Sequence, residues 1–153
     1  MRFFEFLRAL ASELTAGRNE DPSVVPRRDR AFRAPRAKDE LGRAGEELAA
    51  ARFKKERWKI LERNLSLPSC EIDIVARDGG NLVFVEVKTR RRRGYTDPYE
   101  EVPEVRRNRM RRAAGEYLRW RGLDRETPLR FDIAMIIWPE GEAPLFEHIK
   151  DAF

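Results

Sequence analysis

The sequence predicts an α/β domain in which helices flank a mixed central sheet. Two stretches, 41–56 and 103–121, repeat apolar residues at helical spacing, whereas 82–87 and 129–138 are mainly apolar runs of strand length, interrupted only by Glu86, Arg130 and Asp132. Between two further strand-like runs stands Asp78-Gly79-Gly80-Asn81, a strong tight-turn signal. The predicted order is helix, three strands, helix and one or two strands, which gives a layered α/β architecture.

The first 38 residues differ in composition from the rest of the 153-residue chain. Residues 3–14 place apolar side chains along one helical stripe, and residues 18–38 carry three prolines among many charges. We therefore expect an N-terminal helix and a flexible, basic, Pro-containing linker over 1–38, followed by one domain over 39–153. The leading helix could dock on the domain, meet a partner or touch a membrane surface.

The charge distribution favours a polyanionic partner. Lys and Arg number 32 against 27 Asp and Glu, for a net charge of +5, and basic residues dominate from 88 to 125. Such runs suit nucleic acid first and an anionic membrane second, with DNA favoured over RNA as the nucleic acid. The alternative is a solvated Arg-rich surface.

Several classes of protein and site are excluded by composition. Cys70 and His148 are each the only residue of their type, which excludes a disulfide framework, a multi-histidine or Cys-based metal centre and a Ser-His-Asp triad. A metal would need oxygen ligands, which suits Mg²⁺ or Mn²⁺. No apolar run approaches the roughly 20 residues of a transmembrane segment, and Glu5 and Arg8 interrupt any signal peptide. A cytoplasmic location is expected.

The first domain helix is predicted over 41–56, followed by a strand over 58–64. Leu41, Ala44 and Leu48 lie on one face of the helix, and Glu46 lies on a neighbouring stripe with Phe53. Glu46 is therefore expected at the margin of the buried face, beside the sheet.

The two strands around Gly79 and Gly80 carry the main candidate site. With these glycines as the loop, opposite residues have numbers that sum to 159, which places Asp73 opposite Glu86 and Glu71 opposite Lys88 on one face. Opposed like charges destabilise a sheet by a sizeable part of roughly 0.2–1 kcal/mol. A divalent cation between Asp73 and Glu86 would reverse that sign. A solvated face with salt bridges is the alternative, but the 82–87 run is apolar on both faces and so predicts a central, covered strand.

The remaining chain supplies a basic loop, a second helix and two strands. The loop over 89–101 could hold phosphates and stack a base, although an ordinary surface loop is an equally good explanation. A helix follows over 103–121 with Gly122 as its C-cap. Strands are expected over 129–138 and 144–149, with Asp132 as a strand-end or supporting group. The candidate nucleic-acid-binding residues are Arg90, Arg91, Arg92, Arg93, Tyr95, Arg106, Arg107 and Arg109.

The order of these residues resembles the PD-(D/E)xK nuclease superfamily, whose restriction-endonuclease-like core is helix, three-stranded meander, helix and strand. More narrowly, the sequence is similar to the YraN family, whose members are distantly similar to archaeal Holliday-junction resolvases. The similarity covers roughly 41–149. Where the family has Gly and Lys, this chain has Cys70 and Arg106. The residues that carry the similarity to the YraN family are Gly45-Glu46, Glu71-Ile72-Asp73, Phe84-Val85-Glu86-Val87-Lys88 and Arg130-Phe131-Asp132.

The resemblance implies a metal-dependent endonuclease. Asp73, Glu86 and the backbone carbonyl of Val87 would bind Mg²⁺ or Mn²⁺, with Glu46 joining through water or a second ion. Lys88 would orient the attacking water and stabilise charge in the transition state. Recognition would follow DNA shape, with branched DNA as one candidate, and a homodimer is expected by analogy.

Three other functions stay open at this point. The fold could serve a nucleic-acid-binding protein without catalysis, or a nuclease that acts on RNA. A third possibility is a scaffold or membrane-surface adaptor that uses the helix over 3–14. Deleting residues 1–38 and comparing binding to junction DNA and to anionic vesicles would separate the third from the others.

Overall fold

A computed structural model of the chain describes residues 40–92, 94 and 97–153. The predicted segment over 1–38 and the predicted nucleic-acid-binding residues Arg93 and Tyr95 lie outside the described residues. The described elements are α2 (Glu40–Lys55), β1 (Lys59–Ser66), β2 (Glu71–Asp78), β3 (Asn81–Arg90), α3 (Glu104–Arg121), β4 (Leu129–Ile137) and β5 (Leu145–Ile149).

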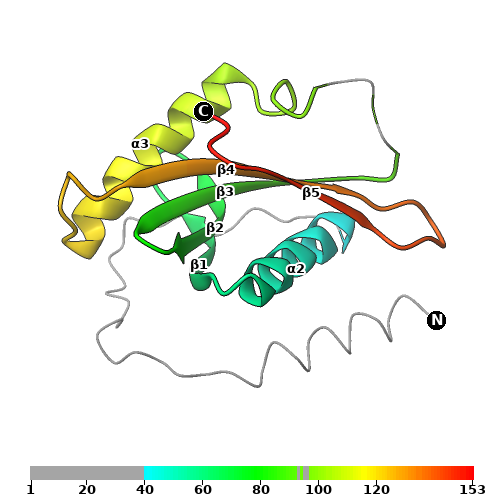
Figure 1. The fold of residues 1–153 in the computed structure, drawn as a ribbon. Helices are drawn as coiled ribbons and strands as arrows, with labels where there is room; N and C mark the ends of the chain where they lie inside the picture. Colours follow the sequence, from blue (N-terminus) through cyan, green and yellow to red (C-terminus); the bar gives the residue numbers. More distant parts are fainter. Residues whose placement is uncertain (1–39, 93, 95–96) are drawn as a thin grey trace.

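The strands form one five-stranded sheet in the order β1-β2-β3-β4-β5. β3 and β4 are parallel, and the other neighbours are antiparallel, so the sheet is mixed as the sequence predicts. Figure 1 shows α2 against one face and α3 against the other. Because parallel neighbours need a crossover, α3 lies in the connection that carries the chain from β3 to β4. The predicted mixed sheet flanked by helices, consistent with a restriction-endonuclease-like core, is confirmed.

The β2–β3 hairpin has the predicted register up to the point where its strands separate. Gly79 adopts a positive φ of 57°, and the pairs from Asp78–Asn81 to Ile74–Val85 all have numbers that sum to 159. Ile74–Val85 is the last paired position. Asp73 and Glu86 therefore fall one step beyond the ladder, where the two strands no longer exchange backbone hydrogen bonds.

Strand β3 is covered on both faces, which confirms its predicted central position. Val83 and Val85 pack with Phe53 and other α2-side residues, whereas Phe84 packs on the opposite face with Tyr117 of α3. These side chains are no more than 1% exposed. Burial of each contributes about 1.5–3 kcal/mol, so the sheet holds the strand end that carries Glu86 rigidly in place.

Some predicted boundaries were wrong by a few residues. Thr89 and Arg90, expected in a loop, continue β3 because they pair with Ile136 and Ile137 of β4. The first strand runs over Lys59–Ser66 rather than 58–64.

The predicted end of α3 is confirmed. Helix α3 stops at Gly122, whose φ of 62° is left-handed, as expected for a glycine C-cap. No helix among the residues that the structure describes has the length and apolarity to span a membrane.

Candidate active site

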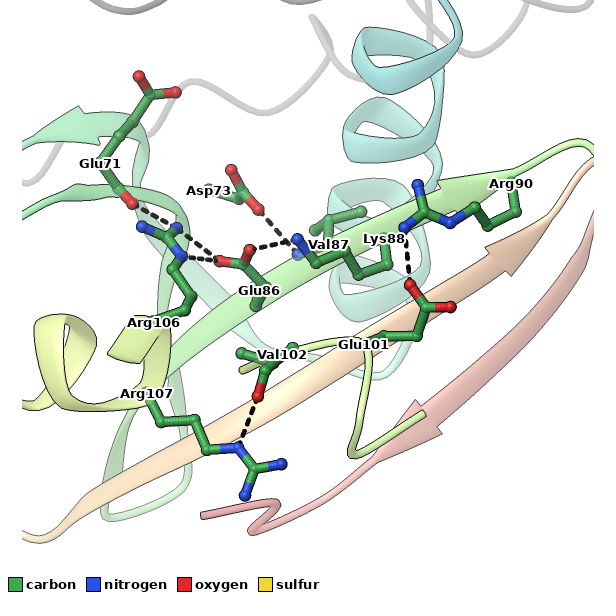
Figure 2. Close-up of polar contacts among 10 residues, drawn as sticks. All are labelled: Glu71, Asp73, Glu86, Val87, Lys88, Arg90, Glu101, Val102, Arg106 and Arg107. Carbon is green, nitrogen blue, oxygen red and sulfur yellow. Dashed lines mark hydrogen bonds and ion pairs between the residues drawn. The ribbon is translucent and has the colours of Figure 1, made fainter. Parts of the chain in front are cut away.

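Glu86 lies on β3 between two cationic side chains. Glu86 is buried, with 4% of the residue exposed, although charged side chains contact its carboxylate. Lys88 Nζ lies 2.9 Å from Oε1, and Arg106 donates to Oε2 from its terminal nitrogen at 2.6 Å and from Nε at 3.1 Å. Figure 2 shows these contacts from opposite sides of the carboxylate. Both Glu86 oxygens therefore carry a cationic donor.

The charge of Glu86 is stabilised by these partners despite its burial. Burial raises the pKa of the carboxyl group, but the hydrogen bonds and positive charges of Arg106 and Lys88 outweigh it and hold that pKa below its usual value. Glu86 is therefore an ionised carboxylate at neutral pH. An ionised, buried oxygen donor is the kind of group that a divalent cation requires.

Asp73 lies beside Glu86 where β2 and β3 separate. Its side chain is buried, and Oδ2 accepts a hydrogen bond of 2.8 Å from the backbone N–H of Val87. The carboxylate thus satisfies a peptide group that the β-ladder no longer pairs. Because Val87 stands between Glu86 and Lys88, this bond fixes Asp73 next to both of them (Figure 2). The structure brings Asp73, Glu86, Val87 and Lys88 together, as the sequence predicts.

Arg106, predicted as a phosphate contact, forms the far side of the site. It lies in the first turn of α3, and its terminal nitrogen donates both to Glu86 and to the backbone carbonyl of Glu71 at 2.7 Å. Burial lowers the pKa of the guanidinium, but the hydrogen bond and negative charge of Glu86 raise it by more. The pKa of Arg106 therefore lies above its usual value. Arg106 therefore joins α3 to the ends of β2 and β3 as a permanent cation.

Glu46, expected at the margin of the buried face, is itself buried on α2, and α2 lies very close to β3 there. A Cβ atom at the preceding residue, Gly45, would stand 1.8 Å from Thr89 Oγ1, so only glycine permits this approach. Within the described part of the chain, no three or more Asp, Glu, His or Cys side chains form a metal-binding cluster. Glu46 is therefore not gathered with Asp73 and Glu86 into one direct ligand set.

Besides Arg106, three of the predicted nucleic-acid-binding arginines have partners within the protein. Arg90 pairs with Glu101 at 2.7 Å, and Arg107 donates to the carbonyl of Val102 at 2.7 Å and to that of Tyr99 (Figure 2 shows the Glu101 and Val102 contacts). These bonds hold the segment that leads into α3. Arg91 reaches the carbonyl of Trp138 at 3.5 Å, while Arg92 and Arg109 are exposed.

The comparisons with known proteins identify the family. A family model described as "Uncharacterised protein family UPF0102" matches residues 45–136. The chain belongs to this family. A UPF0102 protein of Geobacter sulfurreducens is 43% identical over 113 residues, which are 74% of this chain and 88% of that protein. UPF0102 proteins of Renibacterium salmoninarum and Streptomyces griseus are 39% and 41% identical over 115 and 114 residues, covering 75% and 74% of this chain and 97% and 96% of theirs.

The UPF0102 match agrees with the resemblance to the YraN family, and it spans Glu46, Asp73, Glu86, Lys88 and Arg106. At Cys70 the chain departs from the family pattern, but the structure shows no backbone strain there. Cys70 replaces a glycine, yet among the described residues the non-glycine positions with positive φ are Arg57, Asn64 and Asp151. Cys70 therefore adopts a backbone conformation that a side chain allows.

Asp132 belongs to a different part of this UPF0102 domain. Its register partner is Val85, whose side chain packs on the α2 face, whereas Glu86 contacts Arg106 of α3. Asp132 is completely buried and contacts Arg130 at 2.9 Å and His148 at 2.8 Å. The sequence could not indicate the His148 contact, since sixteen residues and a strand reversal separate the two side chains.

Proposed function

We propose that this UPF0102 protein is a metal-dependent endonuclease that hydrolyses phosphodiester bonds in DNA and selects DNA structure rather than sequence. The observation that carries the proposal is the meeting of Asp73, Glu86 and Lys88 where β2 and β3 separate. Lys88 lies 2.9 Å from the buried Glu86, and a second buried acid, Asp73, is bonded to the peptide N–H between them. Burying several charged groups together costs desolvation free energy that their pairing does not always offset, so a sheet that only has to fold has no need of the arrangement. Perturbed charge clusters of this kind mark functional sites.

The residues fit a hard divalent cation. Asp73, Glu86 and the carbonyl of Val87 are oxygen donors at one strand end, and they would hold Mg²⁺ or Mn²⁺, with Glu46 acting through water or a second ion. When bound, such a cation polarises a phosphate oxygen and lowers the pKa of a bound water.

Lys88 and Arg106 would then act on the phosphate. Glu86 would give up one of its two cationic donors in order to hold the cation. Arg106 is a long side chain with a quarter of its surface exposed, and its planar fork matches two phosphate oxygens once Glu86 is released. Lys88 would remain beside the attacking water and stabilise the charge that develops on the phosphate.

DNA binding would come from the basic surface around this site. Exposed Arg92 and Arg109 flank the strand end and the start of α3, where they would contact backbone phosphates. Such contacts give affinity that falls steeply with salt and carries no base sequence. Branched or flapped DNA is therefore the first substrate to test, and RNA of the same shape is the second.

The test is cleavage of junction and flap DNA in Mg²⁺ by Glu86→Ala and Lys88→Ala variants. Both should lose cleavage by orders of magnitude while keeping most of their DNA affinity. Glu62→Ala is a matched control, because Glu62 is also a strand glutamate paired with an arginine of α3, Arg121, at 3.3 Å. Wild-type cleavage by the Glu86 and Lys88 variants would refute the assignment.

A second candidate function is nucleic-acid binding without catalysis. The observation in its favour is that both Glu86 oxygens already have cationic partners, which leaves the carboxylate neutralised without any metal. In that case DNA would be bound equally well with Mg²⁺ and with a chelator, and no substrate would be cut.

A further inference from the structure

A hollow of about 270 Å³ lies at the end of β3, where Arg90 forms part of its lining. Its sides come from three separate parts of the chain: the end of β3, the segment before α3, and strands β4 and β5. The residues used below are Arg90, Pro98, Glu101, Met135, Ile137 and Glu147. None of them has a part in the chemistry proposed above.

The strand register places the hollow on the same face of the sheet as Glu86. Lys88 pairs with Met135 and Arg90 pairs with Ile137 across β3 and β4. Met135 in turn pairs with Glu147 across β4 and β5. Because paired residues project from one face and alternate residues of a strand share it, Glu86, Lys88 and Arg90 form a row that leads into the hollow. From Glu86 to Arg90 the row spans about 13 Å, four residues at about 3.3 Å each.

The chemistry of the lining is divided between floor and rim. Met135 and Ile137 form an apolar floor on β4, where they are 6% and 9% exposed. Charged groups stand at the rim, namely Arg90 with its partner Glu101 on one side and the exposed Glu147 on the other. An apolar floor with a polar rim suits a flat ligand with an apolar face and hydrogen-bonding edges.

The size and position of the hollow indicate which flat ligand it accepts. Its volume lies just below the roughly 300–1,000 Å³ of pockets for drug-sized ligands, so it has room for a single ring system and none for a base pair. A nucleotide strand whose phosphate lies at Glu86 and Lys88 would reach Arg90 with its next units. A base of that strand can enter the hollow only if it is unpaired.

We propose that this hollow binds one unpaired nucleobase of the strand whose phosphodiester lies at Glu86 and Lys88. The base lies on Met135 and Ile137, while Arg90 faces its phosphate or its ring edge. The inference rests on the proposed nuclease function and narrows the substrate class to DNA with a single-stranded segment next to the cut. A fully paired duplex cannot supply the base.

The experiment measures equilibrium binding of the full chain to fluorescent flap DNA by anisotropy, in Ca²⁺ so that the DNA stays intact. In a series of oligonucleotides, one abasic unit replaces each nucleotide of the flap and its junction in turn. We expect one position where losing the base weakens binding by about five- to tenfold, the size of a single stacking contact. Abasic units elsewhere should have little effect.

The variant Ile137→Ala should bind the intact flap more weakly by a similar factor, and the sensitive abasic position should no longer matter. Ile136→Ala is the matched control: the same change one residue earlier on β4, in the core on the α2 face. It should keep the full abasic effect. If either alanine variant fails to fold, Ile137→Val and Ile136→Val repeat the comparison with a smaller change in volume.

Two results would overturn the inference while leaving the nuclease proposal intact. One is DNA binding with no sensitive abasic position, as expected if the hollow holds a peptide or a second protein instead. The other is an abasic effect that persists unchanged in Ile137→Ala. Failure to bind flapped, branched or single-stranded DNA at all would instead overturn both proposals.

Discussion

Two buried carboxylates, Glu86 and Asp132, stand on neighbouring parallel strands and differ by one step in register. Each is ionised and paired with an arginine, and for each the hydrogen bonds and the positive charge of its partners outweigh burial and hold its pKa below the usual value. They project from opposite faces of the sheet. Burial and a lowered pKa alone therefore do not distinguish an acid that only supports the fold from one at a candidate active site.

The difference lies in their partners. Asp132 is bound by Arg130 and His148, which are 12% and 14% exposed, and by the backbone N–H of Asp151 at 3.0 Å. The two partners of Glu86, Lys88 and Arg106, are each 25% exposed. The acid at the candidate site has partners that can move into solvent and exchange for a ligand. The side-chain partners of Asp132 are only about half as exposed, and its third donor belongs to the backbone.

The largest expected effect separates activity from folding at Glu86. Glu86→Gln keeps the shape of the side chain but removes the charge that would hold a cation, so cleavage should fall by about 10³-fold or more. Because Lys88 and Arg106 reach solvent, its cost in the free energy of unfolding should be smaller than that of the Asp132 substitution. Single-turnover cleavage and urea denaturation measure the two quantities. A Glu86→Gln protein with normal cleavage would remove the basis of the comparison.

The reverse result is expected at Asp132. Asp132→Asn removes a completely buried charge that accepts hydrogen bonds from Arg130 and the backbone N–H of Asp151, although Arg130 keeps its ion pair with Asp78 at 2.9 Å. The substitution should cost about 2–3 kcal/mol in the free energy of unfolding. Cleavage by the fraction that remains folded should stay near normal at low temperature, since Asp132 faces away from the site. Urea denaturation monitored by tryptophan fluorescence gives the first value. A loss of cleavage without a loss of stability would place Asp132 in the catalytic machinery.

A smaller effect tests whether the partners of Glu86 can be exchanged. Arg106→Ala removes a cation that competes for Glu86, so Mn²⁺ should bind several-fold more tightly, as measured by calorimetry without DNA. DNA affinity should fall, because the arginine fork no longer reaches the phosphate. Arg121→Ala removes the matched Glu62 pair on the same helix and should leave Mn²⁺ affinity unchanged. Unchanged or weaker Mn²⁺ binding by Arg106→Ala would exclude Glu86 as the cation site.

The smallest effect is a pH dependence of stability. The pKa of Asp132 lies below the usual 3.8 in the folded protein, so its contribution is fully present above that value and is lost as pH falls through the folded-state pKa. The free energy of unfolding should therefore decline below about pH 4 in the wild type, and Asp132→Asn should lack that part of the decline. Urea midpoints between pH 3 and pH 6 would show it. Parallel declines in both proteins would assign the acid sensitivity to other groups.

The part of the site that comes from the β2–β3 hairpin could be predicted from the sequence. Gly79 and Gly80 fix the turn, the turn fixes the register, and the register brings Asp73 beside Glu86. Alternation then puts Lys88 on the same face as Glu86. Each step depends on residues close in the chain, for which backbone geometry leaves few alternatives.

The contacts between residues far apart in the chain could not be predicted from the sequence. The contact between Arg106 and Glu86 depends on how α3 docks, and the loop before it can lead the helix in several directions. The face on which Asp132 lies depends on the parallel register between β3 and β4, which a crossover of many residues leaves undetermined. For the same reason the contact between His148 and Asp132 and the hollow at Arg90 could not be predicted, because both depend on where β5 lies.

The difference between local and distant contacts also predicts the order in which parts of the protein fold. The β2–β3 hairpin closes through a two-residue turn and can form while the rest of the chain is still unstructured. Arg106, and the strand β4 beyond it, must be brought back over a much longer loop. Glu86 therefore acquires its lysine early and its arginine late. In pulse-labelled hydrogen exchange, amides of β2 and β3 should gain protection before those of α3 and β4. The complete set of contacts around Glu86 would then be one of the last features that the folding chain acquires.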